Sequence, residues 1–374
     1  MVLSFAVDGA LNDALAARVY PETEHAYRSP FQRDRDRVIH ARAFRRLAGK
    51  TQVFTRRASD HFRSRLTHTI EVSHIARTVA LALGLNEDLA ETLALVHDIG
   101  HPPFGHAGEK ALDSALQVHG LRFDHNLHAL RIVEHFEQRY AAFRGLNLTL
   151  GVREGIVKHS RDYRASEHPE LSAYLLDKRP PLEAQIIDLA DEIAYLTADL
   201  DDGVESGLLE IDDIRQNVRI FERFYAEMAQ HHTDAPEKLL FAEALKRMLN
   251  ALVVDLIESL RTSLTKQQIH TLEEVRKSPH RLAAFSQVIE EDRRQAKEFL
   301  YSALYQNPTL VRDQNEAAGI VRTLFEHWMQ IPEDLPPGHQ ALLRDEKPAR
   351  IVADYIAGMT DGFILEQYVM QLGA

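Results

Sequence analysis

The stretch that decides the fold is LALVHDIGHPPFGHAGE, at residues 93–109. It starts as an apolar helix and places His97 and Asp98 at the helix end, where a glycine offers a stop signal. Two prolines and two glycines then form an irregular turn that directs His101 and His106. Because buried imidazoles and carboxylates are costly unless they are paired or coordinated, the stretch predicts ligands held by a helical core.

Side chains suited to a divalent cation gather around this stretch. A bare His-Asp pair is uninformative by itself, because one is expected about once by chance in a chain of this composition. The context is informative, because eight of the 20 histidines lie between residues 68 and 128. The chain has no cysteine, so any metal ligands must be His, Asp or Glu. We expect four ligands: His68, His97, Asp98 and Asp191. Such a site accepts Mn, Fe, Co, Ni or Zn, and Mg is a further candidate that would bind with the substrate.

Glu109 follows His106 by three residues on the next predicted helix, within reach of its imidazole. A carboxylate there can orient the ring and raise its basicity, so we interpret the pair as a proton-transfer dyad. The alternative is that Glu109 only serves the dipole of the first helical turn. His125, in the tetrapeptide FDHN at 123–126, is a weaker candidate when taken alone. Four other histidines are interpreted as structural or surface residues: His74, His119, His128 and His135.

Three polar residues on a later amphipathic helix are spaced by four: Asp191, Tyr195 and Asp199. Steps of four advance about 40° around a helix, so these residues form one stripe. A carboxylate, a phenol and a second carboxylate in a row suit contacts to a metal, a sugar ring and a hydroxyl. The alternative is a solvent-facing stripe, which fits Asp201 and Asp202 better.

Apolar residues recur at helical spacing and no strand alternation is sustained, so the predicted class is all-α. One predicted stripe comprises Ile70, Val72, Ile75, Ala76, Val79 and Leu83. Further helices are expected at about 212–230, 237–263, 282–303 and 349–370. The expected plan is a catalytic core at residues 1–203 and a helical C-terminal region at 204–374, which packs on the core or forms one domain with it.

The charge of the chain is unevenly distributed. A net charge of −12 argues against general affinity for nucleic acid, yet residues 28–65 hold eleven arginines and one lysine against three aspartates. Such a block is usually a solvated helix face, but this one runs directly into His68 and suits a polyanion-binding wall. No signal peptide, membrane span or disulfide is expected, so a cytoplasmic protein is the default.

Several motifs together resemble those of the HD-domain deoxynucleotide triphosphohydrolases, specifically the bacterial dGTPase-like proteins. The segments HARAFRRLAGKTQV (40–53) and RLTHTIEV (65–72) are similar to the N-terminal and first core motifs of that family. Residues 97–109 and ADEIAY (190–195) are similar to its other core motifs, and DYIAGMTD (354–361) to its C-terminal signature. The resemblance implies an HD-domain helical bundle with additional C-terminal helices.

The resemblance also implies an activity and residue roles. A deoxynucleoside triphosphate (dNTP) would be cleaved to a deoxynucleoside and intact inorganic triphosphate. The metal ligands would be the four named above, while His101, His106, Glu109 and His125 would surround the α-phosphate and transfer protons. The implied substrate contacts are Arg65 to phosphate, Tyr195 under the deoxyribose, Asp199 to the 3′-hydroxyl, and Arg46 and Leu47 near the base or sugar.

One position departs from the animal relative, which carries a lysine directly after the fourth ligand. This chain has Glu192 there, so the triphosphate must be bound by other cations. The candidates are Arg42, Arg45, Lys50, Lys158 and Arg161. The resemblance further implies a homo-oligomer and leaves open activation by a dNTP. The basic block leaves room for weak binding of single-stranded nucleic acid.

Two alternatives stay open from the sequence. The chain could be another HD phosphohydrolase, such as a nucleotidase or a guanosine polyphosphate hydrolase, which would release phosphate or pyrophosphate instead of triphosphate. It could also be a nucleotide- or single-strand-binding protein with an idle HD site. The complete ligand set and the Glu109 dyad argue against an idle site.

Overall fold

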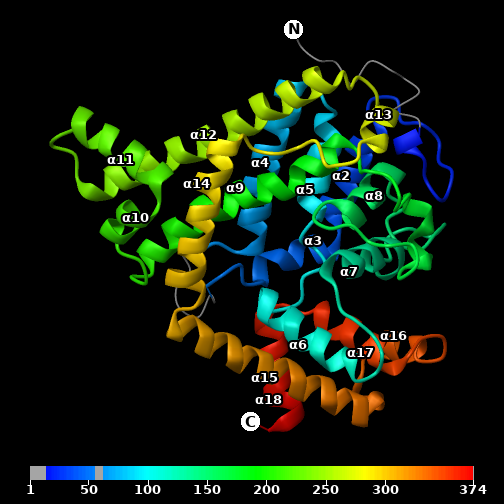
Figure 1. Cartoon of the computed structure of the whole chain (residues 1–374). Helices are drawn as coiled ribbons and strands as arrows, with labels where there is room; N and C mark the ends of the chain where they lie inside the picture. The colour runs from blue at the N-terminus through cyan, green and yellow to red at the C-terminus, as the bar shows by residue number, and fades with distance from the viewer. Residues whose placement is uncertain (1–13, 55–61, 374) are drawn as a thin grey trace. The chain divides into compact units, whose positions relative to one another are not determined.

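The structure, a computed structural model, describes residues 14–54 and 62–373. The first residues, for which no signal peptide is expected, lie outside these ranges. Part of the basic block, residues 55–61, also lies outside them. Helices make up most of the chain, which confirms the all-α class (Figure 1). Within the described ranges the only β-pairing consists of two isolated bridges, Thr51 with Ser64 and Gln138 with Gly145.

The helices group into two compact units that interleave along the chain. Unit 1 comprises residues 1–36, 68–95 and 148–307, and unit 2 comprises residues 37–67, 96–147 and 308–374. The predicted contiguous division at residue 203 falls inside unit 1 and stays a prediction.

Unit 1 is built around α9 (Leu182–Glu205), against which α8 (Leu150–Lys158) and α12 (Glu237–Gln267) pack. The apolar face of α9 is buried because its residues repeat at helical spacing. The other elements that lie wholly or mostly in unit 1 are α2 (Pro30–His40), α4 (Arg65–Leu83), α5 (Glu87–Val96), η3 (Pro169–Tyr174), α10 (Ile211–Asn217), α11 (Arg219–His231), α13 (Leu272–Lys277), α14 (Gln287–Phe299) and η4 (Leu300–Tyr305).

Unit 2 is built around α15 (Pro308–Gln330), which packs against α6 (Gly105–Gln117), α17 (Pro348–Ala357) and α18 (Asp361–Leu372). The indole of Trp328 on α15 is fully buried in the shared apolar core. The remaining elements of unit 2 are α3 (Arg42–Arg46), η1 (Leu47–Gly49), α7 (His125–Arg131), η2 (Ile132–Phe136), η5 (Pro332–Asp334) and α16 (Pro337–Leu342).

Several predicted helices are interrupted, and capping explains two of the corrections. The helix expected at 282–303 starts only at Gln287, because Ser286 caps it by accepting from the amide of Ile289. The helix expected at 349–370 is two helices, since Thr360 caps α18 and starts a new segment. The helix expected at 212–230 is broken at Val218. The predicted stripe on α4 is buried except at Ile70, which is 43% exposed.

No helix among those described is long and apolar enough to span a membrane.

Candidate metal and catalytic site

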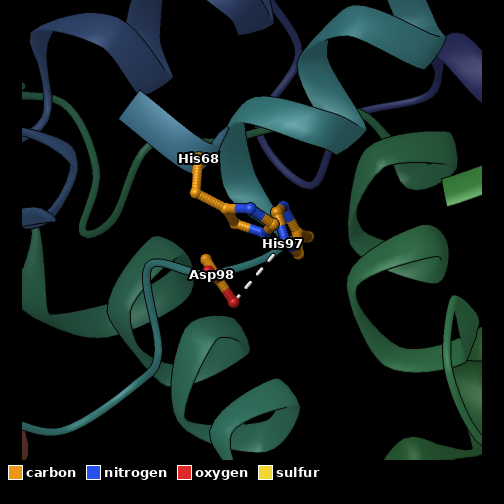
Figure 2. A group of neighbouring side chains, drawn as sticks. All are labelled: His68, His97 and Asp98. Atoms are coloured by element: carbon orange, nitrogen blue, oxygen red, sulfur yellow. Dashed lines mark ion pairs between the residues drawn. The ribbon is translucent and has the colours of Figure 1, made fainter. Parts of the chain in front are cut away.

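The core of the site in unit 2 is the turn that follows α5. Helix α5 ends at Val96, and His97 and Asp98 come next, each only 4% exposed. Nε2 of His97 lies 3.5 Å from Oδ1 of Asp98, the ion pair that Figure 2 marks with a dashed line. The structure thus presents an imidazole and a carboxylate together at a helix end, as the sequence predicted.

Arg65 fixes the charge state of Asp98. Its guanidinium donates to Oδ2 of Asp98 at 2.7 Å, and both side chains are buried. Burial alone would raise the pKa of Asp98, but Arg65, His97 and His101 outweigh burial and hold the pKa well below its ordinary value. Asp98 is therefore an ionised carboxylate, the form that a divalent cation binds.

Gly100 has a role beyond the helix stop inferred from the sequence. Helix α5 has already ended at Val96, and a Cβ on Gly100 would lie only 1.9 Å from the carbonyl oxygen of His125. Only glycine permits this close approach of α7 to the turn. The approach lets the rings of His101 and His125 stack, with centroids 3.9 Å apart.

Glu109 is shared between two imidazoles. Its Oε1 lies 2.8 Å from Nδ1 of His125, whereas its Oε2 lies 3.5 Å from Nδ1 of His106. The ring of His106 is 73% exposed, and that of His125 is mostly buried. The dyad predicted for His106 is thus a triad whose shorter contact goes to His125. Asp124 could have signalled this, because it caps α7 and so fixes His125 in the first turn.

The protonation states of this triad are set by mutual contacts. Burial would raise the pKa of Glu109, but hydrogen bonds with His106 and His125 lower it strongly. Burial would lower the pKa of His125, yet Glu109 outweighs burial and the net shift is upward. For His101, burial and then the charges of Arg65 and His125 lower the pKa well below its ordinary value. An anionic Glu109 therefore supports a proton on His125 beside a neutral His101.

The remaining predicted ligands lie in unit 1. Nε2 of His68, on α4, lies 2.7 Å from Oδ1 of Asp191, on α9. His68 is almost fully buried, and a third of the Asp191 side chain is exposed. Tyr195 and Asp199 follow Asp191 on α9, as the predicted stripe requires.

The predicted stripe on α9 meets residues that sequence reasoning missed. The hydroxyl of Tyr195 donates to Oε1 of Glu192 at 2.9 Å, and the hydroxyl of Tyr305 donates to Oδ2 of Asp199. Burial and then the nearby carboxylates raise the pKa of both phenols, so each remains a donor.

Two cationic side chains of α14 also contact the Glu192 carboxylate. Arg293 contacts its Oε1, and the ammonium of Lys297 donates to the same oxygen at 2.9 Å. Lys297 further lies 5.9 Å from the centroid of the Tyr195 ring. In sequence, basic residues on an amphipathic helix are typical of a solvated face, so no local signal distinguishes this pair.

Other predicted contacts are already engaged within the protein. The ammonium of Lys50 is buried and donates to the carbonyl oxygens of His101 and Ala357. Lys158 is buried against Glu154 at 2.9 Å, which leaves it poorly placed for a phosphate. Arg161 is exposed.

The predicted base or sugar contacts lie in unit 2. Arg46 is exposed and donates to the carbonyl oxygen of Gly358, and Leu47 is fully buried. Within the described part of the basic block, several arginines donate to carboxylates or to backbone carbonyl oxygens. Contacts of this kind are made by Arg28, Arg33, Arg35, Arg37 and Arg65. Substrate binding by Arg46, Leu47 and Lys50 stays a prediction. Binding of a polyanion by the basic block stays a prediction too.

Comparison with protein families now defines the class. Residues 65–196 match the HD domain, and residues 283–370 match the phosphohydrolase-associated domain. The chain is therefore a phosphohydrolase of the HD superfamily, a hydrolase class whose domain binds divalent metal ions. The His and Asp donors present suit such an ion, because imidazole nitrogen and carboxylate oxygen are its usual protein ligands.

Curated relatives then place the chain within that class. It is 46% identical to a deoxyguanosinetriphosphate triphosphohydrolase-like protein of Thiobacillus denitrificans, over 98% of this chain and 96% of the relative. Proteins with the same description from Azoarcus sp. and Leptospira interrogans are 44% and 40% identical, over 98% and 97% of this chain and 95% and 94% of theirs. The chain belongs to the family of deoxyguanosinetriphosphate triphosphohydrolase-like proteins.

Proposed function

We propose that this protein hydrolyses deoxynucleoside triphosphates to a deoxynucleoside and inorganic triphosphate, with a divalent metal ion. The observation that carries the proposal is the arrangement in unit 2, where ionised Asp98 and the Glu109 triad are held by one turn and two helices. The near-full-length relatives, by their description, make dGTP the first substrate to test.

We assign the metal ligands to two pairs, the buried pair of His97 with Asp98 and the pair of buried His68 with partly exposed Asp191. Each pair offers a nitrogen and an oxygen in close contact, the donor set that such ions take. When bound, the ion would polarise a phosphate and acidify a water molecule.

We assign proton transfer to the Glu109 triad. Glu109 is anionic and holds an imidazole on each side, so it can keep a proton on His125 or His106 for delivery to a departing oxygen. His101, buried and neutral beside Asp98, can hydrogen-bond to a phosphate without adding charge. Arg65, the first residue of α4, neutralises the charge of Asp98 by donating to its carboxylate.

We assign binding of the terminal phosphates to Lys297 and Arg293. Both side chains form ion pairs with Glu192, which occupies the position where the animal relative has a lysine. Half of the Lys297 side chain is exposed, so its ammonium can turn from Glu192 toward a phosphate at little cost. Tyr195, one turn along α9, then offers its ring to the sugar.

Product analysis tests the proposed function. Purified protein is incubated with each dNTP, singly and mixed, and with Mn, Mg, Co, Ni, Fe or Zn, and the products are separated by anion-exchange chromatography. Release of deoxynucleoside with intact triphosphate is expected. Phosphate or pyrophosphate would instead identify another HD phosphohydrolase, and no hydrolysis with any metal would overturn the proposal.

Lys297→Gln is expected to raise KM for a dNTP about tenfold while kcat changes little, since a charge contacting the terminal phosphates contributes mainly uniform binding. Steady-state kinetics on dGTP, or on the best substrate found, checks this. Lys246→Gln is the matched control, because Lys246 is also exposed and pairs with a glutamate, Glu243, three residues away. An unchanged KM in Lys297→Gln would refute the assignment.

Tyr195 is expected to select deoxyribose. A ring packed under C2′ leaves no room for a 2′-hydroxyl and offers it no partner, so wild type should hydrolyse dGTP and not GTP. Tyr195→Ala is expected to narrow the ratio of kcat/KM for dGTP over GTP by at least about tenfold. Tyr195→Phe keeps the ring and loses only the bond to Glu192, so its ratio should stay near that of wild type. A constant ratio in Tyr195→Ala would make Tyr195 an ordinary packing residue.

A further inference from the structure

The C-terminal signature at residues 354–361 has no role in the function proposed above, yet its last residue contacts two segments of the site. Asp361 is the first residue of α18. Its Oδ2 accepts from the backbone amide of Thr51 at 2.7 Å and from the hydroxyl of Thr51. Its Oδ1 accepts from the backbone amide of Phe104 at 2.9 Å. One carboxylate therefore joins two loops that are far apart in sequence.

The first segment leads directly to Arg65. Thr51 forms a β-bridge with Ser64, and the amide of Arg65 donates to the carbonyl oxygen of Lys50 at 3.2 Å. The Arg65 side chain then reaches Asp98. Because a β-bridge aligns two chain segments in register, the position of Thr51 sets where α4 starts and where the guanidinium of Arg65 lies.

The second segment leads directly to His106. Phe104 has φ +62°, in the left-handed region that is unfavourable for a bulky residue, and it precedes α6. A strained conformation of this kind persists only when neighbouring groups hold it. The carboxylate of Asp361 supplies such a contact by accepting from the Phe104 amide.

The two segments also meet each other. A Cβ on Gly105 would lie 2.9 Å from Nη2 of Arg65, so the Phe104 turn and the start of α4 leave no spare space between them. A second tie runs parallel, since Lys50 donates to the carbonyl oxygens of His101 and Ala357. A small displacement of either segment would therefore be transmitted to both Arg65 and the histidine turn.

We propose that Asp361 is a positioning residue, which holds the Thr51 bridge and the Phe104 turn together and thereby places Arg65 and His106 for the reaction. The inference rests on the proposed function for its kinetic consequence and on geometry alone for the tie between the loops. Asp361 touches no reacting atom and acts only through its three hydrogen bonds. The C-terminal helices of unit 2 thus take part in the chemistry by fixing loops.

Two variants of Asp361 test the proposal by kinetics. Asp361→Ala is expected to lower kcat about a hundredfold, the scale on which a misplaced catalytic group loses activity, with a smaller change in KM. Asp361→Asn keeps an acceptor for one amide and lacks the second, so it should lose about tenfold and partly rescue the alanine variant. Thr51→Val removes only the hydroxyl donor and should fall near the asparagine variant.

Amide hydrogen exchange, followed by mass spectrometry, tests the tie without any need for activity. Peptides covering residues 48–54 and 99–109 should exchange faster in both Asp361 variants, while the rest of the chain stays unchanged. Thr360→Ala is the matched control, because it removes the cap of α18 and leaves the contacts of Asp361 in place. It should leave kcat and both peptides within about twofold of wild type.

The outcomes separate this inference from the proposed function. Unchanged exchange in Asp361→Ala overturns the tie, and faster exchange with unchanged kcat overturns the positioning role. An equal loss of kcat in Thr360→Ala would assign the effect to general destabilisation of α18 and also overturn the inference. If wild type hydrolyses no nucleotide, the proposed function fails, and exchange alone then decides whether Asp361 holds the two loops.

Discussion

Asp191→Ala is expected to strip the divalent ion and to lower kcat/KM by at least about a thousandfold, because a Lewis-acidic ion contributes several kcal/mol to the transition state. In the proposed ligand set Asp191 would supply one oxygen, and it contacts His68, so its loss would remove a ligand and free the imidazole that it holds. Asp98→Ala should have the same effect and additionally leave Arg65 buried without its carboxylate. Asp98→Ala is therefore also expected to be less stable than Asp191→Ala.

The measurement for both variants is metal content of the purified protein by elemental analysis, together with turnover and thermal unfolding. Glu205→Gln is a matched control, since Glu205 lies on α9 as Asp191 does and makes an exposed ion pair with Lys238. Its metal content and turnover should equal those of wild type. Wild-type metal content in Asp191→Ala would show that the ligand set has been assigned wrongly.

Glu109→Ala is expected to lower kcat by about a hundredfold or more while the metal stays bound, the usual scale for losing a positioned acid or base. Glu109 holds both His106 and His125, so its removal releases two imidazoles at once. His106→Ala should lose activity to a similar extent. Since the group acts as a unit, the double variant of Glu109 and His106 should be little worse than either single variant.

A second double variant, Glu109→Ala with His125→Ala, tests the contact that only the structure revealed. At 2.8 Å this pair is closer than the pair with His106, and non-additivity is again expected. Glu134→Gln serves as a control, because Glu134 lies on η2, just after α7 and outside the triad. Additive losses in both double variants, or changes confined to KM, would contradict a shared role in proton transfer.

The sequence alone determined whatever depends on spacing along one element. His97 and Asp98 follow an apolar helix, and Glu109 lies one turn after His106, so their proximity follows from helical geometry. The stripe of Asp191, Tyr195 and Asp199 follows from the same period. The all-α class was predictable for this reason too, because apolar residues repeat at helical spacing through most of the chain.

Contacts between distant segments were decided only by the tertiary structure. The sequence gives no reason for Lys297 to contact Glu192, 105 residues earlier, or for Asp361 to contact Thr51, 310 residues earlier. A carboxylate at the first turn of a helix is a common dipole partner, and a lysine on a helix is a common surface residue, so neither position stands out locally.

The positions of helix ends also depended partly on contacts that the sequence does not reveal. The break before α18 depends on Thr360, whose capping role cannot be separated in sequence from that of any other threonine in an apolar-periodic run. Gly100 resembled a simple helix stop, yet its role is to admit the backbone of His125, a contact fixed by the path of α7. Periodicity is a local property of the chain, whereas packing selects which of its polar residues meet. For this protein, packing decides how the residues of the candidate site are held.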